Sequence, residues 1–287
     1  RKLEHDVDLF FYPHINLPYY IPKNTVVTIH DLRPLTHFWD RNEIKRKAFL
    51  FYLKRAIKHS AKIITVSNTV ANTLKQTFKW LNKYIEVIYE FVDDKFIVGH
   101  NQDEPIFNKP YILFVGNRKK HKNIELLINA FFRVKNDIPH YLIIAGSKEK
   151  DYDHVDTLLE KLGLKDRVIE FLQPSDKTIT NLYTFADLLV FPSLFEGFGL
   201  PPLEAVSLGC PVILSDIPVL REIFGESGLY FNPYSVDSLA EAILKVIYDR
   251  NLREELLKKQ QERSRIFNKD RIIDKYIELF DKIRLKG

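Results

Sequence analysis

Sulfur-containing residues are nearly absent from the 287-residue chain, which has a single cysteine and no methionine. One cysteine excludes a disulfide framework. Cys210 stands between Gly209 and Pro211 at the start of an apolar stretch, which predicts a buried thiol in a reducing compartment. The lack of methionine and the opening on Arg1 are consistent with a fragment, or with residues missing from the sequence.

Long hydrophobic runs are also absent. No run of about 18 apolar residues occurs and no signal peptide opens the chain, so we expect a cytoplasmic protein. The content of 45% hydrophobic and 28% charged residues is that of a globular protein, and the length is sufficient for two domains. The net charge of +5, from 43 Lys and Arg against 38 Asp and Glu, favours anionic ligands or a membrane surface without requiring either.

Two series of strand and helix patterns predict an α/β protein of two domains. A polar segment from Asp93 to Lys109 is the best linker candidate. After it, strands and helices alternate, which predicts a parallel sheet covered on both faces. We expect an N-terminal domain over residues 1–100 and a C-terminal domain over residues 101–287, with C-terminal helices that cross back to the N-terminal domain. The predicted strands are Asp8–Tyr12, Thr25–Ile29, Ile63–Val66 and Ile85–Tyr89, then Tyr111–Val115, Tyr141–Ala145, Val168–Phe171, Leu188–Phe191 and Pro211–Leu214.

The stretch from Asp187 to Val212 combines a predicted strand, a turn with two glycines and the start of a helix. The apolar run Leu188–Phe191 is typical of a parallel strand buried on both faces. Two consecutive prolines are tolerated only in the first turn of a helix. We therefore expect a helix from Leu200 to Leu208 that ends at Gly209.

Two glutamates stand eight positions apart in this stretch, Glu196 in the turn and Glu204 about one turn inside the helix. Carboxylates are acceptor-only groups that suit pairs of ligand hydroxyls, and the free N–H groups of a helix start suit a phosphate. The same spacing also fits an ordinary strand-turn-helix of a doubly wound sheet, with both glutamates in solvent.

The run E-G-F-G-L-P-P-L-E resembles the E-x7-E signature of the retaining glycosyltransferases of family four. The resemblance continues through FPSLFEGFGLPPLEA, G-C-P-V and SDIPVLREIFGESGLYFNP, although the methionine that often follows the E-A pair is absent. It implies an α/β protein of GT-B fold, with two Rossmann-like doubly wound domains facing a cleft. It also implies that Glu196 contacts the transferred sugar and that Glu204 binds the ribose hydroxyls. Backbone N–H groups that hold sugar and phosphate oxygens are implied at Gly197, Phe198, Gly199 and Leu200.

A basic segment, G-N-R-K-K-H-K-N, follows the predicted strand Tyr111–Val115. Arg118 and Lys122 therefore lie at the carboxyl end of a strand, where open α/β sheets bind ligands. A guanidinium and an ammonium suit the two phosphates of a nucleotide diphosphate, although a solvated basic loop would look the same. The segment is similar to the one in which an Arg and a Lys of the family hold the donor's diphosphate, which implies this role for Arg118 and Lys122.

His30, in V-V-T-I-H-D, also stands at the carboxyl end of a predicted strand. A neutral imidazole there can donate to a sugar hydroxyl or a carbonyl oxygen, but a lone histidine is more often a structural residue. The segment resembles the one whose histidine faces the donor sugar in the family, which implies a catalytic position. Where the family often has Asn-Gly-Val-Asp before the linker, the chain departs with E-F-V-D from Glu90 to Asp93.

Asp151 and Asp153, followed by His154 and Asp156, raise the question of a metal site. They lie at a predicted helix start, where the helix dipole favours acidic residues in any case, so we expect no metal and no cofactor. The resemblance implies the same, because two basic residues and a helix N-terminus take the role that divalent cations have in other transferases.

Four predicted strands precede the linker, fewer than the roughly six of a complete doubly wound half, and no glycine-rich turn follows the first strand. We therefore expect an incomplete N-terminal, acceptor-side domain. An amphipathic helix from Asn42 to His59 carries lysines and arginines beside Phe49, Phe51 and Tyr52. It is either a peripheral contact at the inner face of the membrane or a helix that covers the sheet.

With the resemblance, these features predict a metal-independent, retaining glycosyltransferase. It would move a hexose from a nucleotide diphosphate sugar to a saccharide or lipid-linked saccharide in the synthesis of cell-surface polysaccharide such as lipopolysaccharide. GDP-mannose is the first choice of donor, on resemblance to bacterial mannosyltransferases. The alternatives are a nucleotide-sugar epimerase or phosphorylase of related architecture, and a non-catalytic sugar-nucleotide-binding module. No nucleic-acid motif is present, and no nucleic-acid partner is expected.

Overall fold

The computed structural model describes residues 7–36, 43–97, 104–148 and 154–284. By its internal contacts the chain divides into two compact units. The first contains Arg1–Phe91, Glu196–Phe198 and Phe267–Gly287, and the second contains Val92–Phe195 and Gly199–Ile266. The division falls before the polar segment that composition suggested as a linker. That segment begins with a short helix, η3 (Asp94–Phe96), whose Phe96 is buried, so it packs as part of the second unit.

The first unit is built on a sheet of parallel strands in which β1 to β4 lie in chain order. The strands span Phe10–Tyr12, Thr25–Ile29, Lys62–Thr65 and Ile85–Val87. All residues of β2 are buried, which suits its β-branched sequence in the interior of a sheet. The predicted strands are confirmed, with bounds that shift by a few residues at their ends.

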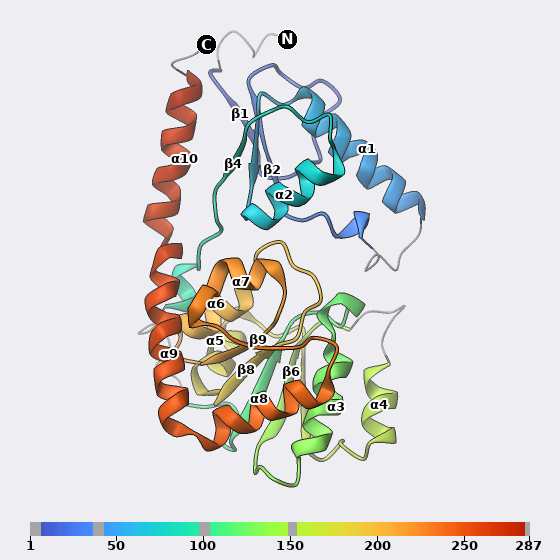
Figure 1. The fold of residues 1–287 in the computed structure, drawn as a ribbon, viewed down its shortest axis with the longest axis vertical. Coiled ribbons are helices and arrows are strands. Elements are labelled where there is room, and N and C mark those ends of the chain that lie inside the picture. The colour runs from blue at the N-terminus through green and yellow to red at the C-terminus, as the bar shows by residue number, and fades with distance from the viewer. Residues whose placement is uncertain (1–6, 37–42, 98–103, 149–153, 285–287) are drawn as a thin grey trace. The chain divides into compact units, whose positions relative to one another are not determined.

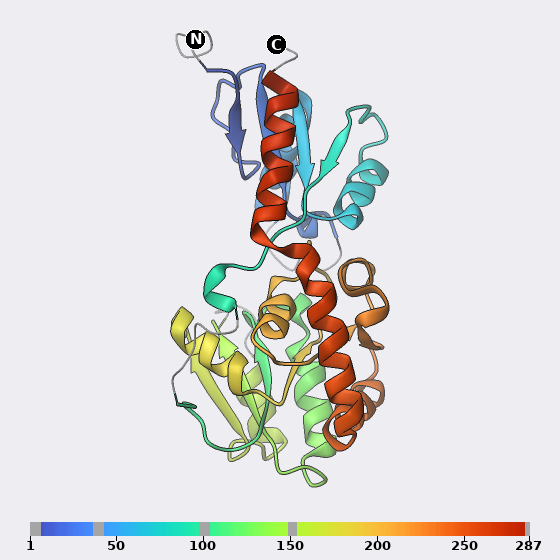
Figure 2. The ribbon, with the colours of Figure 1, turned by 90° about the vertical axis from the view of Figure 1, so that its left-hand side faces the viewer.

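Three longer helices accompany this sheet, α1 (Glu43–His59), α2 (Asn68–Thr77) and α10 (Lys269–Arg284). Ser67 caps α2 by accepting a hydrogen bond from the backbone N–H of Val70 at 3.1 Å, as expected of a serine before a helix. The C-terminal helix α10, red in Figures 1 and 2, lies alongside the strands of the first unit. Its Ile272 and Leu279 pack with Val26 of β2, so the end of the chain completes the core of this unit.

Helix α1 is buried only near its C-terminal end, at Leu53, Ala56 and Ile57. In contrast, Ile44 is 73% exposed and Phe51 is 62% exposed. Within the described residues, no helix combines the length and the apolarity that crossing a membrane requires.

The sheet of the second unit has six parallel strands in the order β10-β9-β8-β5-β6-β7. The sequence predicted the first five strands of this unit but not β10, which is three residues long. The strands span Tyr111–Val115 (β5), Tyr141–Gly146 (β6), Val168–Leu172 (β7), Leu188–Phe191 (β8), Val212–Ser215 (β9) and Leu229–Phe231 (β10).

Helices cover both faces of this sheet. Right-handed crossovers place α3 and α4 on one face and α5, α6 and α7 on the other, because the chain moves across the sheet in opposite directions on either side of β5. Helix α8 packs on α3, and α9 packs on α6 and α7. The doubly wound parallel sheet is therefore confirmed. The helices span Ile124–Val134 (α3), Val155–Lys161 (α4), Asp176–Phe185 (α5), Leu200–Ser207 (α6), Pro218–Phe224 (α7), Val236–Tyr248 (α8) and Arg250–Ser264 (α9).

The centre of the second sheet contains a topological switch point. Strands β5 and β8 are neighbours, with Ile112 opposite Leu188 and Leu113 opposite Leu189, yet their following helices lie on opposite faces. The loops after these two strands therefore separate at the carboxyl edge of the sheet. Ligands of open α/β sheets bind in the crevice that such a separation leaves.

Candidate functional site

Lys122 is carried by the loop that follows β5. It ends a short helix, η4 (Lys120–Lys122), and its half-buried ammonium lies 5.3 Å from the ring centroid of Phe191, the last residue of β8. The backbone N–H of Leu194 donates to the carbonyl oxygen of His121 at 2.7 Å, which ties this loop to the one after β8. The structure thus brings Lys122 to the switch point between β5 and β8. The sequence predicted its place at the carboxyl end of β5 but not which strand lies beside it.

The start of α6 is the second part of the site. Gly199, with a φ of 105°, is the N-cap residue, and a side chain would be strained in this left-handed conformation. No side chain caps the helix. Pro201 and Pro202 have no N–H, so the helix start offers its dipole and the N–H groups of Gly199 and Leu200. Prolines in the first turn fix the start at Leu200, which confirms the prediction. An uncapped helix start beside the switch point is suited to an anion.

Glu204 lies on α6, one turn beyond this start, and its carboxylate faces Tyr183 of α5. The Tyr183 hydroxyl donates to Oε2 of Glu204 at 3.1 Å. Burial raises the pKa of Glu204 to about 7, although the hydrogen bond from Tyr183 and the nearby Lys95 ammonium act in the opposite direction. The pKa of this carboxyl group is therefore shifted toward neutral pH.

The turn residues Glu196–Phe198 belong to the first unit by their contacts. A Cβ atom on Gly197 would lie 2.0 Å from the carbonyl oxygen of His30, so only glycine fits there. Ser67, the N-cap of α2, donates its hydroxyl to the Gly197 carbonyl oxygen at 2.8 Å. The Phe198 ring is buried, with its centroid 5.9 Å from that of Tyr89. The segment that carries Glu196 is therefore held against the backbone of His30.

His30 itself has a hydrogen-bond acceptor at each ring nitrogen. Its Nε2 lies 2.7 Å from the carbonyl oxygen of Pro13, and its Nδ1 lies 2.9 Å from the Glu90 carboxylate. The hydrogen bond to Glu90 raises the pKa of His30, and burial opposes it. Because both partners are acceptors, the structure favours the imidazolium rather than the neutral imidazole that the sequence suggested. Glu90, the first residue of the departure from the family pattern, is thus the partner of the candidate histidine.

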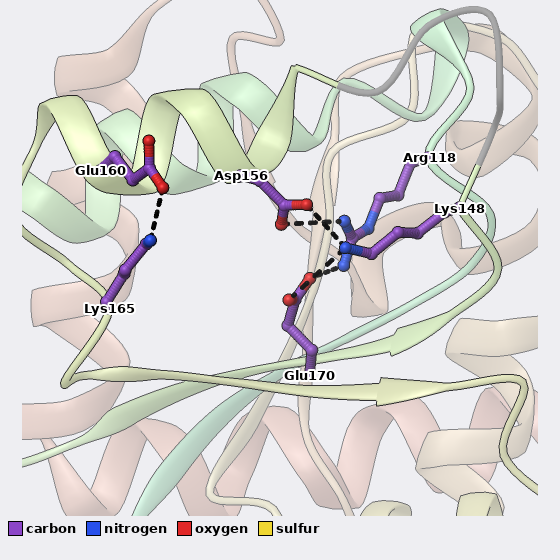
Figure 3. A network of polar contacts seen from close by, with 6 residues as sticks. All are labelled: Arg118, Lys148, Asp156, Glu160, Lys165 and Glu170. Carbon is purple, nitrogen blue, oxygen red and sulfur yellow. Dashed lines mark hydrogen bonds and ion pairs between the residues drawn. The ribbon is translucent and has the colours of Figure 1, made fainter.

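Arg118 faces carboxylates of its own chain (Figure 3). Its side chain is 1% exposed, and its guanidinium forms an ion pair with Glu170 of β7. Asp156 of α4 lies 3.8 Å from the same guanidinium, and Lys148 contacts Asp156 at 2.7 Å. A contact with phosphate would require Arg118 to leave these partners. The role in diphosphate binding therefore stays a prediction for Arg118. In the described conformation its ion pair with Glu170 connects the loop after β5 to β7.

Among the described residues, no group of three or more His, Cys, Asp or Glu side chains is arranged to hold a metal ion. Asp151 and Asp153 lie outside the described residues. The carboxylate of Asp156 is engaged by Lys148, and this hydrogen bond lowers its pKa.

Two family profiles match consecutive parts of the chain. Residues 100–263 match the family described as Glycosyl transferases group 1, and residues 2–96 match Glycosyltransferase Family 4. The chain belongs to these glycosyltransferases. O-antigen chain mannosyltransferase RfbU of Salmonella typhimurium is 34% identical over 225 residues, which are 78% of this chain and 61% of the relative. O-antigen chain mannosyltransferase B of Escherichia coli is 35% identical over 147 residues, which are 50% of this chain and 38% of the relative. The chain thus spans about three fifths, or less, of the length of these glycosyltransferases.

Solved structures show the same fold. Sucrose-phosphate synthase from Thermosynechococcus elongatus has a TM-score of 0.77 at 22% identity, over 94% of this chain and 70% of that one. WaaG, a glycosyltransferase involved in lipopolysaccharide biosynthesis, has a TM-score of 0.73 at 18% identity, over 92% and 75%. Anabaena HepE, in complex with UDP and glucose, has a TM-score of 0.72 at 21% identity, over 90% and 71%. These matches confirm the predicted GT-B fold.

Sequence reasoning missed the side chains that support the candidate residues. Tyr183 and Glu170 lie in a helix and a strand where nothing distinguishes them from ordinary core or surface residues. Glu90 did carry a signal, because it stands where the family pattern has another residue. Each is a partner from a distant part of the chain, so only the fold shows the pairing.

Proposed function

We propose that this protein is a retaining glycosyltransferase. It transfers a hexose from a nucleotide diphosphate sugar to a saccharide or lipid-linked saccharide in cell-surface polysaccharide synthesis, with GDP-mannose as the first choice of donor. Membership of the family supports the reaction class, and the O-antigen mannosyltransferases among its relatives support the sugar. The UDP complex of a protein with the same fold supports a nucleotide ligand.

One observation carries the proposal. Lys122 and the uncapped start of α6 both follow strands that flank the switch point of the second sheet, β5 and β8. A cation and a helix N-terminus at one edge can together hold a diphosphate and stabilise the charge that develops on it as the sugar leaves. Glu204, one turn further along α6, then accepts hydrogen bonds from the ribose hydroxyls of the same ligand.

The remaining roles follow the family resemblance. Glu196 contacts the transferred sugar, and backbone N–H groups from Gly197 to Leu200 hold sugar and phosphate oxygens. His30 also contacts the sugar. The support from the first unit is that the segment with Glu196 packs against the backbone of His30, and that Glu90 keeps the ring of His30 in one orientation.

Helix α1 is proposed as a contact with an anionic membrane surface at the inner face of the membrane. Ile44 and Phe51, two helical turns apart, share one exposed face of the helix. Lys47 and Lys54 flank this face and are exposed as well. Apolar side chains bordered by lysines are typical of helices that lie in a membrane interface. A lipid-linked acceptor would be reached there.

The test is incubation with GDP-mannose, UDP-glucose and UDP-N-acetylglucosamine, with and without a mannose-terminated oligosaccharide, and detection of new glycosides by mass spectrometry. With the accepted donor, Glu196→Ala is expected to lower kcat, and Glu204→Ala to raise mainly the donor KM. Glu160→Ala, which changes an exposed glutamate paired with Lys165, is the matched control and should leave both constants unchanged.

A new glycoside with retained anomeric configuration is the expected product. Nucleotide release without a glycoside would favour an epimerase or phosphorylase, and nucleotide binding without turnover would favour a binding module. A normal kcat for Glu196→Ala at saturating donor would remove this residue from the proposed site.

A further inference from the structure

Tyr183 is a fully buried tyrosine whose hydroxyl donates a hydrogen bond to Glu204, a candidate binding residue. It lies near the end of α5, and the centroid of its ring is 6.0 Å from that of Phe96 in an edge contact. Its hydroxyl donates to Oε2 of Glu204 at 3.1 Å. Burial raises the pKa of Tyr183, so the hydroxyl keeps its proton and the carboxylate is the acceptor.

The hydrogen bond occupies one oxygen of a carboxylate that is only partly buried. A carboxylate has about four acceptor positions on its two oxygens, so most of them remain for a ligand. An ionised carboxylate can accept hydrogen bonds from two neighbouring hydroxyls at once, whereas a protonated one must use one oxygen as a donor. The binding of a diol therefore depends on which form Glu204 holds.

Charged groups on the elements around α6 shift the ionisation of Glu204, some toward the carboxylate and some toward the protonated acid. Lys95 of η3 favours the ionised form of Glu204, as the Tyr183 hydroxyl does, while Asp176 of α5 and Asp93, which precedes η3, oppose it. Lys95 is itself paired with Asp176 at 2.7 Å, so its effect on Glu204 is shared. Tyr183 is then the one neutral donor among these groups that bonds directly to the carboxylate.

Of the other elements that pack on α6, α9 carries charged residues, and its arginines nearest to these elements have partners elsewhere: Arg253 contacts Asp187 at 3.2 Å, and Arg263 donates to the carbonyl oxygen of Ile223 at 2.7 Å. From α9, the amide of Gln261 donates to the carbonyl oxygen of Val206 at 3.4 Å. Strands β8 and β9 hold only apolar residues and Ser215. Cys210, which follows α6, is buried, and burial raises the pKa of its thiol, so it is neutral. Nothing on these elements replaces the hydrogen bond from Tyr183.

We propose that Tyr183 is a positioning residue for nucleotide recognition, whose hydroxyl holds the Glu204 carboxylate as an acceptor for the vicinal hydroxyls of a ribose. This inference rests on the proposed function, since it assumes that a nucleotide occupies the site. It has two consequences. Nucleotide affinity falls as the pH drops through the range in which Glu204 is protonated, and removal of the Tyr183 hydroxyl moves that fall to higher pH.

The experiment is calorimetric titration of the protein with GDP and UDP from about pH 5.5 to about pH 8.5, a range that brackets the titration of Glu204. Tyr183→Phe removes a single oxygen and keeps the ring in place. At neutral pH it is expected to raise the Kd roughly five- to tenfold, as for loss of one hydrogen bond that holds a charged group. For 2′,3′-dideoxyguanosine diphosphate, which lacks the hydroxyls, wild type and Tyr183→Phe should bind equally.

Tyr111→Phe is the matched control, because Tyr111 is equally buried in the same unit but donates its hydroxyl to the Leu182 carbonyl oxygen. It should leave the Kd unchanged at every pH. A Glu204→Gln background keeps only the pH dependence that comes from the terminal phosphate of the nucleotide, and in it Tyr183→Phe should have no further effect. The double variant thereby separates positioning of Glu204 from a general loosening of the fold.

Wild-type binding with a Kd that Tyr183→Phe leaves unchanged over the whole pH range would overturn the inference and leave the proposed function intact. An equal loss for the dideoxy nucleotide would overturn it too, because the effect would not pass through the ribose. Absence of GDP and UDP binding by the wild-type protein would overturn the proposed function itself.

Discussion

Replacement of Arg118 by glutamine tests whether this arginine holds a ligand or joins the strands of the second sheet. The family resemblance implies a contact with the diphosphate, but the guanidinium is buried against Glu170. We expect Arg118→Gln to lower the thermal stability of the second unit. For the protein that remains folded, the Kd for GDP should stay within about twofold of wild type, a difference worth about 0.4 kcal/mol.

The size of the stability loss follows from the burial of the pair. Removal of one partner of a buried ion pair costs about 3 to 5 kcal/mol. The Glu170 side chain is 25% exposed and has Lys148 at 3.9 Å, so water and a second cation reduce the cost. We therefore expect about 2 kcal/mol, which for a domain of this size lowers the melting midpoint by roughly 4 to 8 °C.

Glu170→Gln should lower the stability more than Arg118→Gln does, because it leaves a positive guanidinium that is 1% exposed without its carboxylate partner Glu170. The variant with both Arg118→Gln and Glu170→Gln should be more stable than the sum of the single losses predicts, since two neutral amides replace the pair. Lys165→Ala is the control. It breaks the exposed pair with Glu160 in the same region (Figure 3), and such pairs contribute about 1 kcal/mol or less.

Thermal unfolding followed by circular dichroism measures the first effect, and calorimetric titration with GDP and with guanosine measures the second. The reasoning is refuted if Arg118→Gln keeps the wild-type midpoint but loses affinity for GDP and not for guanosine. That result would make Arg118 a phosphate ligand, as the sequence resemblance implies.

Two further predictions concern the first unit. Glu90→Gln should lower the pKa of His30, which NMR titration measures, and an unchanged titration would contradict the pairing. The variant should also lose at most about 1 kcal/mol of folding stability, because the ion pair is partly exposed. This loss should be complete below the unfolded pKa of His30 and should disappear as the pH rises through the raised folded pKa. The protein should sediment with anionic liposomes at low salt and less at high salt. Phe51→Ser should weaken this binding by roughly three- to tenfold, because insertion of an exposed aromatic ring contributes about 1 kcal/mol or more. The control is Tyr234→Ser in the second unit, where Tyr234 is 72% exposed, and it should leave sedimentation unchanged. Absence of low-salt binding would remove α1 as a membrane contact.

The sequence predicted most of the fold because its strands are short apolar runs and its helices begin with recognisable caps. Leu188–Phe191 and the proline pair after Gly199 are examples in which a local rule decides the structure. The helix α7 and the strand β10 were missed. Pro218 opens α7, which has no side-chain cap. Strand β10 is an isolated run of three residues, whereas β1 and β4, which are equally short, lie within the longer patterns Asp8–Tyr12 and Ile85–Tyr89.

The candidate site was predicted less completely, because its side chains are paired across long stretches of chain. The sequence placed the loop of Lys122 and the helix of Glu204 after predicted strands, and therefore at the carboxyl edge of a parallel sheet. No local rule pairs His30 with Glu90 or Arg118 with Glu170. These contacts depend on which strands are neighbours in the sheet and on their register, and neither is written in a short motif.

The pKa of Glu204 sets this carboxylate apart from that of Glu170, which is paired with Arg118. Burial raises its folded pKa to about 7, above the value near 4.5 of an unperturbed glutamate, so the stabilisation from its protonated form is present at low pH and lost as the pH rises through about 7. Arg118 and Glu170, by contrast, neutralise each other where they are buried. A carboxylate whose ionisation lowers stability at neutral pH is more typical of a binding site than of a structural ion pair. Glu204 has this property, and one tyrosine hydroxyl supports its ionised form. That cost falls on Glu204 and not on Arg118, which supports Glu204 rather than Arg118 in the proposed contact with a nucleotide.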